Sequence, residues 1–157
     1  MINILFVCLG NICRSPLAEG LFGNHCHQHG LDRGFTIDSA GTGDWHIGKP
    51  PDSRAIQVAT EFQLDISSQR ARQIRGSDFQ NFEWIIAMDR NNLIELESLA
   101  TNYPSHARIA LLSSLISKPG FIDVPDPWFG NYNDFQHTAS LLDRACCKLF
   151  NELFADD

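Results

Sequence analysis

Four short, largely apolar runs predict four strands. Such runs are typical of strands buried on both faces of a parallel sheet. Each is bounded by polar residues or by turn residues such as the Gly41-Thr42-Gly43 segment. The predicted strands are Ile2–Val7, Phe35–Ala40, Glu83–Met88 and Arg108–Leu112.

Between and after these runs, apolar residues recur with helical spacing. The clearest pattern is at the end of the chain, where apolar positions step by 4, 3, 4, 3 and 4 residues and form one continuous stripe: Phe135, Ala139, Leu142, Cys146, Leu149 and Leu153. Shorter patterns predict helices over Ser53–Phe62, Ser77–Phe82 and Asp89–Leu99, the last capped by Asp89. A long irregular stretch, Ser113–Asn133, precedes the final helix.

The first helix follows the first strand after a tight loop. Leu17 and Leu21 share its apolar face. Ser15 and Pro16 have the character of an N-cap and a first helical residue, and Gly30 that of a C-cap. The order strand, loop, helix therefore begins almost at residue 1.

Strands that alternate with helices predict an α/β fold with a doubly wound parallel sheet and right-handed crossovers. The chain shows no internal repeat, and its 157 residues fit a single domain spanning 1–157. In such sheets ligands bind beyond the carboxyl ends of the strands. The loop that begins at Cys8 lies at such an end.

Composition and charge narrow the function classes. Twelve basic residues against 19 acidic ones give a net charge of −7, which argues against non-specific binding to nucleic acid or anionic membranes. No apolar run approaches the roughly 20 residues that span a bilayer. The N-terminal segment lacks the basic region of a signal peptide. We therefore expect a cytoplasmic protein that does not insert into membranes.

Cysteine usage points to chemistry rather than to a disulfide framework. The five cysteines are odd in number and show no paired zinc-binding spacing: Cys8, Cys13, Cys26, Cys146 and Cys147. In a reducing compartment such residues are small buried hydrophobes or reactive groups. Cys8 differs from the others because of the loop around it.

The segment from Cys8 to Ser15, here called the Cys8 loop, has the features of a phosphate cradle. A loop that leads into a helix N-terminus directs several backbone N–H groups and a positive dipole at one point. Gly10 permits close approach of a ligand, Asn11 tolerates left-handed backbone, and Arg14 grips an oxyanion with two hydrogen bonds. The predicted phosphate-binding residues are Leu9, Gly10, Asn11, Ile12, Cys13 and Arg14.

The same groups act on Cys8. Amides, a helix N-terminus and an arginine favour the thiolate form of cysteine, and the Ser15 hydroxyl is well placed to donate to the sulfur. A thiolate beneath a bound phosphate attacks phosphorus in line and forms a phosphocysteine intermediate. Arg14 and the amides then stabilise the charge on the equatorial oxygens.

Such a reaction needs a proton donor for the leaving group. Asp126 is the candidate, because the prolines on both sides, Pro125 and Pro127, hold it in a stiff loop. Trp128 and Phe129 follow at once and, with Trp45, are candidates to line a cleft for an aromatic leaving group.

The motif from Val7 to Pro16, with Asp126-Pro127 far downstream and the same order of strands and helices, resembles the low-molecular-weight protein tyrosine phosphatases over nearly the full chain. The resemblance implies a flavodoxin-like, four-stranded parallel sheet flanked by helices. It implies Cys8 as nucleophile, Arg14 as phosphate clamp and Asp126 as general acid and then general base, without a metal or other cofactor.

Further roles are implied by the resemblance alone. Asn11 would hold the loop in shape through a network that reaches Ser39, and Ser15 would favour the Cys8 thiolate. Cys13 would protect Cys8 from irreversible oxidation through a disulfide, although a packed thiol is the alternative. The substrate pocket would comprise Ile12, Trp45, Trp128 and Phe129.

The implied partners are tyrosine-phosphorylated proteins, and the oligomeric state, monomer or weak dimer, stays open. Three departures from the family pattern stand out. Trp128 and Phe129 replace two tyrosines of vertebrate members, and Gln69 replaces a histidine near the loop. Ile12 stands where relatives that act on phosphoarginine tend to have threonine, which favours phosphotyrosine here.

Three alternatives remain. An arsenate reductase uses the same cradle with two further relay cysteines, for which Cys26, Cys146 and Cys147 are the spares. A phosphate-binding module with a dead site would have lost Cys8, Arg14 or Asp126, and all are present. A metal site at His25 and His29 lacks further ligands, and histidines suit a helix C-terminus. His46 and Arg54 are candidates for the rim of the cleft.

Overall fold

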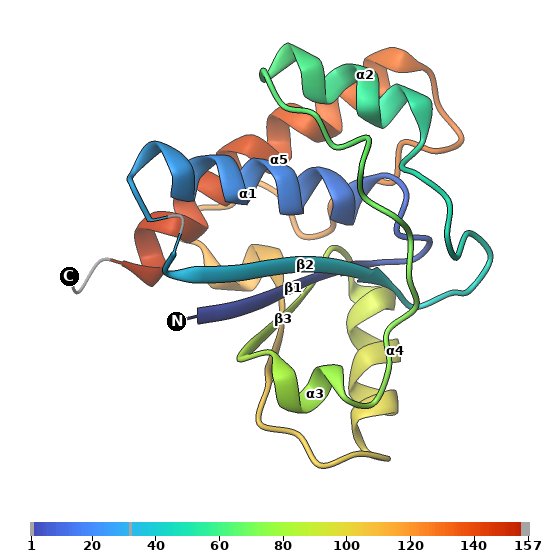
Figure 1. The fold of residues 1–157 in the computed structure, drawn as a ribbon, viewed down its shortest axis with the longest axis vertical. Coiled ribbons are helices and arrows are strands. Elements are labelled where there is room, and N and C mark those ends of the chain that lie inside the picture. The colour runs from blue at the N-terminus through green and yellow to red at the C-terminus, as the bar shows by residue number, and fades with distance from the viewer. Residues whose placement is uncertain (1, 32, 155–157) are drawn as a thin grey trace.

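A four-stranded parallel sheet forms the centre of the protein (Figure 1). The computed structural model describes residues 2–31 and 33–154. Its strands lie in the order β2-β1-β3-β4, with every neighbouring pair parallel. All four predicted strands are confirmed to within one residue at each end: β1 (Ile2–Cys8), β2 (Phe35–Gly41), β3 (Trp84–Ala87) and β4 (Arg108–Leu111).

Helices cover both faces of the sheet, as predicted. Figure 1 shows α1, α2 and α5 on one face and α3 and α4 on the other. The chain leaves β1 for β2 on one side and later returns to β3 on the other side of β1. The carboxyl end of β1 is therefore a switch point, where a ligand site is expected. The helices are α1 (Arg14–Gln28), α2 (Ser53–Glu61), α3 (Asp78–Asn81), α4 (Arg90–Ala100) and α5 (Tyr132–Leu153).

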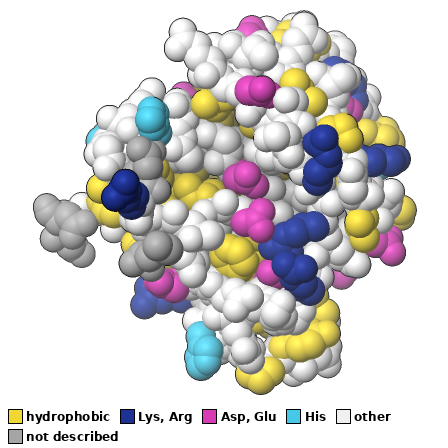
Figure 2. Space-filling model, viewed as in Figure 1, with side chains coloured by type: hydrophobic (Ala, Val, Ile, Leu, Met, Phe, Trp, Pro, Cys, Tyr) yellow, Lys and Arg dark blue, Asp and Glu magenta, His cyan; other side chains and the backbone are white. Residues whose placement is uncertain are grey.

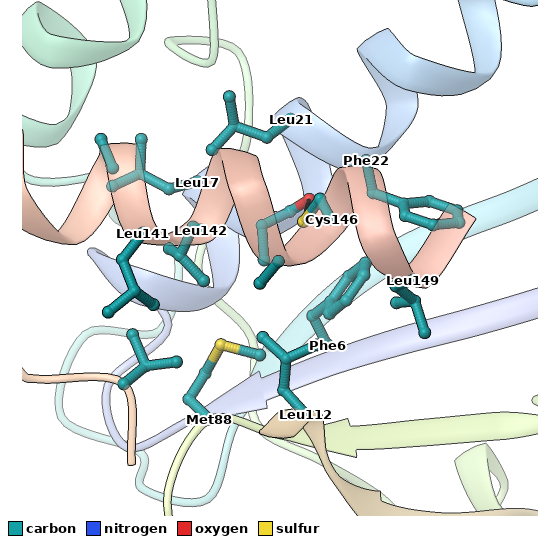
Figure 3. Close-up of a cluster of buried hydrophobic side chains, with 14 of the residues drawn as sticks. Phe6, Leu17, Leu21, Phe22, Met88, Leu112, Leu141, Leu142, Cys146 and Leu149 are labelled. Carbon is teal, nitrogen blue, oxygen red and sulfur yellow. Dashed lines mark hydrogen bonds between the residues drawn. The ribbon is translucent and has the colours of Figure 1, made fainter. Parts of the chain in front are cut away.

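The main core lies between β1 and the two long helices α1 and α5 (Figure 3). Phe6 from β1 and Leu17 from α1 pack there against the apolar stripe of α5. The predicted stripe is buried from Phe135 to Leu149. Burial of apolar surface stabilises a folded protein by about 25 cal/mol per Å². The buried side chains of this layer therefore hold α1 in place against β1 and α5, and α1 in turn holds the loop between β1 and α1.

The two ends of α1 differ in how well the sequence predicted them. Cys13, not Ser15, is the N-cap, and the helix begins at Arg14. The prediction for Ser15 is wrong because its hydroxyl is engaged by Asn11 and Cys8 instead of a backbone N–H. At the other end, Gly30 has a φ of +71° and follows the C-cap residue, as a glycine beyond a helix end should.

Two other boundaries shift. The irregular stretch predicted over Ser113–Asn133 contains part of a 3₁₀ turn, Leu112–Leu115, and α5 begins at Tyr132. Asn131 caps α5 through its side chain, which accepts from Asp134 N–H. The capping box, rather than the first apolar residue, therefore sets the start of this helix.

Candidate active site

The Cys8 loop closes on itself at the carboxyl end of β1. The carbonyl groups of Cys8, Leu9 and Ile12 accept hydrogen bonds from Thr42, Gly43 and Asp52, at 2.8–2.9 Å. In a trans peptide the following N–H points the opposite way. The N–H groups after these carbonyls therefore turn toward the inside of the loop, where an anion would be bound.

Gly41, at the end of β2, lets the loop approach this closely. A Cβ atom at this position would lie 2.8 Å from the Leu9 carbonyl oxygen and 3.2 Å from the Asn11 nitrogen. Both are backbone atoms that cannot move without distorting the loop. The glycine is therefore required by packing of backbone against backbone.

Asn11 holds the loop from within. It has a φ of 56°, in the left-handed region that asparagine tolerates. Its Nδ2 donates to Ser15 Oγ at 2.8 Å and to Ser39 Oγ at 3.0 Å. Its Oδ1 accepts from the backbone N–H of Arg72 at 3.0 Å. The buried side chain thus joins the loop to β2 and to the segment that follows α2.

Cys8 Sγ lies 3.0 Å from Ser15 Oγ. Ser15 already accepts from Asn11, and its other acceptor, the Ala40 carbonyl, is 3.5 Å away. A hydroxyl carries one proton, so the shorter contact assigns that proton to the sulfur. This hydrogen bond ties the Cys8 sulfur to the first turn of α1.

Arg14, the first residue of α1, is 3% exposed. One Nη donates to Asp89 Oδ2 at 2.6 Å and to the Val124 carbonyl at 3.0 Å, and the other lies 3.6 Å from Asp126 Oδ2. Burial alone would lower the pKa of Arg14, but Cys8 and the two carboxylates outweigh it and raise the pKa. The guanidinium is permanently charged.

Asp89 is a site residue that the sequence reasoning missed. It was predicted only as a helix cap, and it does cap α4 through Asn92 N–H at 2.7 Å. Its second oxygen orients Arg14. The signal was available in principle, because Asp89 directly follows the predicted strand Glu83–Met88, but only the order of strands shows that this strand lies beside β1.

One cavity of about 460 Å³ brings the predicted residues together. Cys8 and Arg14 lie among the residues that line it, and Asp126 borders it from a separate loop. His46 also contributes, which was an open question in the sequence, whereas Arg54 is not among the lining residues. Its predicted apolar members are Ile12, Trp45, Trp128 and Phe129.

Asp126 approaches from the segment 124–131, here called the Asp126 loop. Its side chain is 38% exposed, and its Oδ1 accepts from the Trp128 N–H at 3.1 Å. The Trp128 and Phe129 rings meet edge to face, with centroids 4.6 Å apart. They therefore present a wide apolar surface beside the carboxyl group.

Behind the loop, the network runs on to an acid. Ser39 Oγ accepts from Asn11 and donates to Glu19 Oε1 at 2.8 Å. Burial raises the pKa of Glu19 from its usual 4.5 to about 7, against a lowering by Ser39. Gln69 donates to the Pro16 carbonyl at 3.2 Å. Glu19 was not foreseen from the sequence.

Because the pKa of Glu19 is raised, we expect the free energy of unfolding to depend on pH. Its folded pKa lies above its unfolded value, so it favours folding below about pH 4.5, and that contribution is lost as pH rises to about 7. Glu19→Gln keeps an acceptor for Ser39 and removes the charge. We expect the variant to be more stable at pH 8 by up to about 3 kcal/mol and to gain little at pH 4.

Urea denaturation of both proteins at the two pH values checks this expectation. Glu97, exposed on α4, supplies the control Glu97→Gln, which should follow the wild type at both values. A gain by Glu19→Gln that is equal at pH 4 and pH 8 would contradict the assignment.

The segment between α2 and α3 crosses the face seen in Figure 1, and Figure 2 shows basic and acidic side chains together near the middle of that face. Arg72, from this segment, pairs with Asp38 at 3.0 Å and with Asp78 at 3.0 Å. These ion pairs anchor the segment whose Arg72 N–H bonds Asn11. The Arg72 ion pairs thus support the Cys8 loop through Asn11.

Of the other cysteines, Cys13 lines the cavity, whereas the other three do not: Cys26, Cys146 and Cys147. Burial, with Asp52 and Cys8, raises the pKa of Cys13, so that its thiol stays protonated at neutral pH. Cys26 and Cys146 are buried in the core between α1 and α5, and Cys147 is exposed. Neither core thiol lines the cavity, where Cys13 is the cysteine found beside Cys8 among the residues that the structure describes.

The histidine run at the end of α1 has structural partners. His25 pairs with Asp143 at 3.1 Å, and His29 stacks on Phe150 with centroids 4.4 Å apart. Across residues 2–31 and 33–154, no three metal-binding side chains are grouped as they would be around an ion. Within the same ranges, no helix has both the length and the apolar character to cross a bilayer.

Comparison with known proteins places this chain in a family. Residues 3–157 match the family described as low molecular weight phosphotyrosine protein phosphatase. The chain belongs to this family. The resemblance noted in the sequence is thereby confirmed, and homologues named low molecular weight protein-tyrosine phosphatases are hydrolases.

Relatives of this family match almost the whole chain. Low molecular weight protein-tyrosine-phosphatase YfkJ of Bacillus subtilis is 38% identical over 150 residues, 95% of this chain and 94% of that protein. Its crystal structure has a TM-score of 0.90 and covers 100% of this chain and 97% of its own. The crystal structure of the drosophila arginine phosphatase DARP is 31% identical, with a TM-score of 0.91, covering 98% and 99%.

Proposed function

We propose that the protein hydrolyses phosphotyrosine in proteins through a phosphocysteine intermediate. The observation that carries this proposal is one cavity in which a thiol, a buried guanidinium and a carboxyl group meet beside aromatic side chains. Relatives named phosphotyrosine protein phosphatases support the substrate class. The family's hydrolase activity and the local geometry thus point to the same chemistry.

In the first step the Cys8 thiolate attacks phosphorus in line, forming an S–P bond as the P–O bond to the leaving group breaks. Arg14 and the inward N–H groups stabilise the charge on the equatorial oxygens. Asp126 enters this step protonated and gives its proton to the leaving oxygen. Its position at the cavity edge suits that transfer.

In the second step a water molecule replaces the departed alcohol. Asp126, now a carboxylate, takes a proton from this water as its oxygen attacks phosphorus. The S–P bond breaks, inorganic phosphate forms and Cys8 returns as the thiolate. Ser15, which donates to the sulfur, stabilises it as the leaving group.

The cavity favours an aromatic substrate. Trp45, Trp128 and Phe129 provide rings on which a phenol ring can stack. Ile12 adds an apolar contact and offers no hydrogen bond to a guanidinium. Since a chain named arginine phosphatase shares the fold, the choice between phosphotyrosine and phosphoarginine depends on these side chains.

A phosphopeptide panel tests the proposal. Peptides of one sequence carrying phosphotyrosine, phosphoserine or phosphoarginine are compared at equal concentration with EDTA present. The expected result is release of phosphate from phosphotyrosine at a rate at least about tenfold above the others. Preference for phosphoarginine, or activity that EDTA abolishes, would contradict it.

The variant Asp126→Ala tests whether Asp126 is the general acid. Without a proton donor the cleavage of an aryl phosphate should slow by about 10²–10⁴-fold, the usual contribution of general acid catalysis. The loss should be greatest for phenols that are poor leaving groups. A loss below tenfold with such a phenol would place the acid elsewhere. Steady-state rates over a series of substituted phenyl phosphates check this expectation.

A further inference from the structure

Arg54, in the first turn of α2, contacts the back of the Asp126 loop. Its Nη1 donates to the Gly130 carbonyl at 3.0 Å and its Nη2 to the Trp128 carbonyl at 3.1 Å. Its guanidinium carbon lies 4.4 Å from the centre of the Phe135 ring. Arg54 therefore bonds the main chain of the loop two and four residues beyond Asp126, without lining the cavity itself.

Asp52 holds the same guanidinium from the other side. Its Oδ1 and Oδ2 accept from Nε and Nη2 of Arg54, each at 3.0 Å. The backbone N–H of Asp52 donates to the Ile12 carbonyl at 2.8 Å. A continuous path of hydrogen bonds thus runs from the Cys8 loop through Asp52 and Arg54 to the Asp126 loop.

The Asp126 loop needs such a support because, apart from Val124 and Pro127, its residues are not buried. Trp128 and Phe129 are 42% and 89% exposed. Pro127 is buried, and the loop carries two internal bonds, from the Gly130 N–H to the Pro127 carbonyl and from the Trp128 N–H to Asp126 Oδ1. At the other side Thr138 donates to the Pro125 carbonyl at 3.2 Å. Directed hydrogen bonds must therefore fix the segment that follows the acid.

We propose that Arg54 is a positioning residue that sets the place of Asp126 relative to Cys8 and Arg14. The inference rests on the proposed role of Asp126 as general acid. Arginine suits this task because its planar fork has five donors, of which this geometry directs two at carbonyls and others at a carboxylate. Lysine has a point charge and cannot span these acceptors together.

Arg54→Met tests the proposal because it keeps an apolar contact with Phe135 and removes every donor. We expect kcat on phenyl phosphate, a poor leaving group, to fall about 10–100-fold, as for a displaced catalytic group. On 4-nitrophenyl phosphate, whose leaving group needs less protonation, the fall should be at least about threefold smaller. Lower stability alone would reduce both rates equally.

A double variant shows whether the effect passes through Asp126. In the Asp126→Ala background, Arg54→Met should cost less than about threefold on phenyl phosphate, since the group that it positions is gone. Losses that multiply in full would overturn the inference. Arg108→Met is the matched control, because Arg108 also lies over a ring, that of Trp84 at 5.1 Å, at the start of β4. Its rates should stay within twofold of the wild type.

A second variant keeps the inference testable if Arg54→Met unfolds. Asp52→Asn retains an acceptor for the Arg54 N–H that caps α2 and removes the charge that holds the fork. The same dependence on the leaving group is expected, and equal rates on both substrates relative to the wild type would overturn the proposal.

A wild type inactive on both substrates would refute the proposed function itself. An active wild type, an impaired Asp126→Ala and an unimpaired Arg54→Met would refute only this inference.

Discussion

Replacement of Cys8 by serine is expected to reduce hydrolysis of aryl phosphates by roughly 10⁴–10⁶-fold, as when a catalytic nucleophile is removed. A serine hydroxyl at this position has no adjacent base, since Ser15 already accepts from Asn11. The groups that bind phosphate, Arg14 and the inward N–H groups, remain. The variant should therefore still bind inorganic phosphate, measured as a rise in Tm on addition of phosphate.

Cys147→Ser is the control for this experiment. Cys147 is exposed on α5 and lies outside the cavity, so its replacement should leave the rate within twofold. Full activity of Cys8→Ser would end the covalent proposal. Loss of both activity and phosphate binding would show instead that Cys8 shapes the loop rather than attacks the substrate.

Arg14→Lys should be nearly as harmful as Arg14→Ala, with both losing about 10³-fold or more. The Arg14 guanidinium bonds Asp89 and the Val124 carbonyl and also lies near Asp126. An ammonium group is a point charge and cannot hold these partners while gripping two phosphate oxygens. The measurement is kcat/KM on an aryl phosphate for both variants.

Arg75→Lys serves as its control, because Arg75 is 69% exposed and meets Asp78 only at 4.0 Å. It should match the wild type. Activity of Arg14→Lys within tenfold of the wild type would show that charge alone suffices at this position. The claim that Arg14 must bind two phosphate oxygens at once would then be wrong.

The fold could be predicted almost completely because local signals agree with the tertiary structure. Apolar runs gave the four strands, and the stripe from Phe135 to Leu149 is the surface that packs on α1. The sequence-based prediction was wrong where a side chain forms hydrogen bonds with residues other than the one that the local pattern suggests. Ser15 looked like a helix cap, but its hydroxyl faces Cys8 and Asn11.

The site was predictable only in part. The motif around Cys8 and the Asp126-Pro127 pair carry strong local signals, and the structure brings both to one cavity. The supporting residues carry no such local signal in the sequence: Asp89, Glu19 and Arg54. Each acts through a partner far away in the chain, and charged residues of these kinds are common on any surface. Only the packing of strands and loops shows which of them matter.

Direct detection of the phosphorylated thiol tests the central claim. Asp126→Ala is mixed with 4-nitrophenyl phosphate, quenched within one turnover and digested, and mass spectrometry locates the phosphoryl group. Because this variant lacks the base for the second step, the intermediate should accumulate, with the group on Cys8 sulfur. Phosphate on another side chain, or phenol release with no phosphorylated protein at any time, would contradict the account.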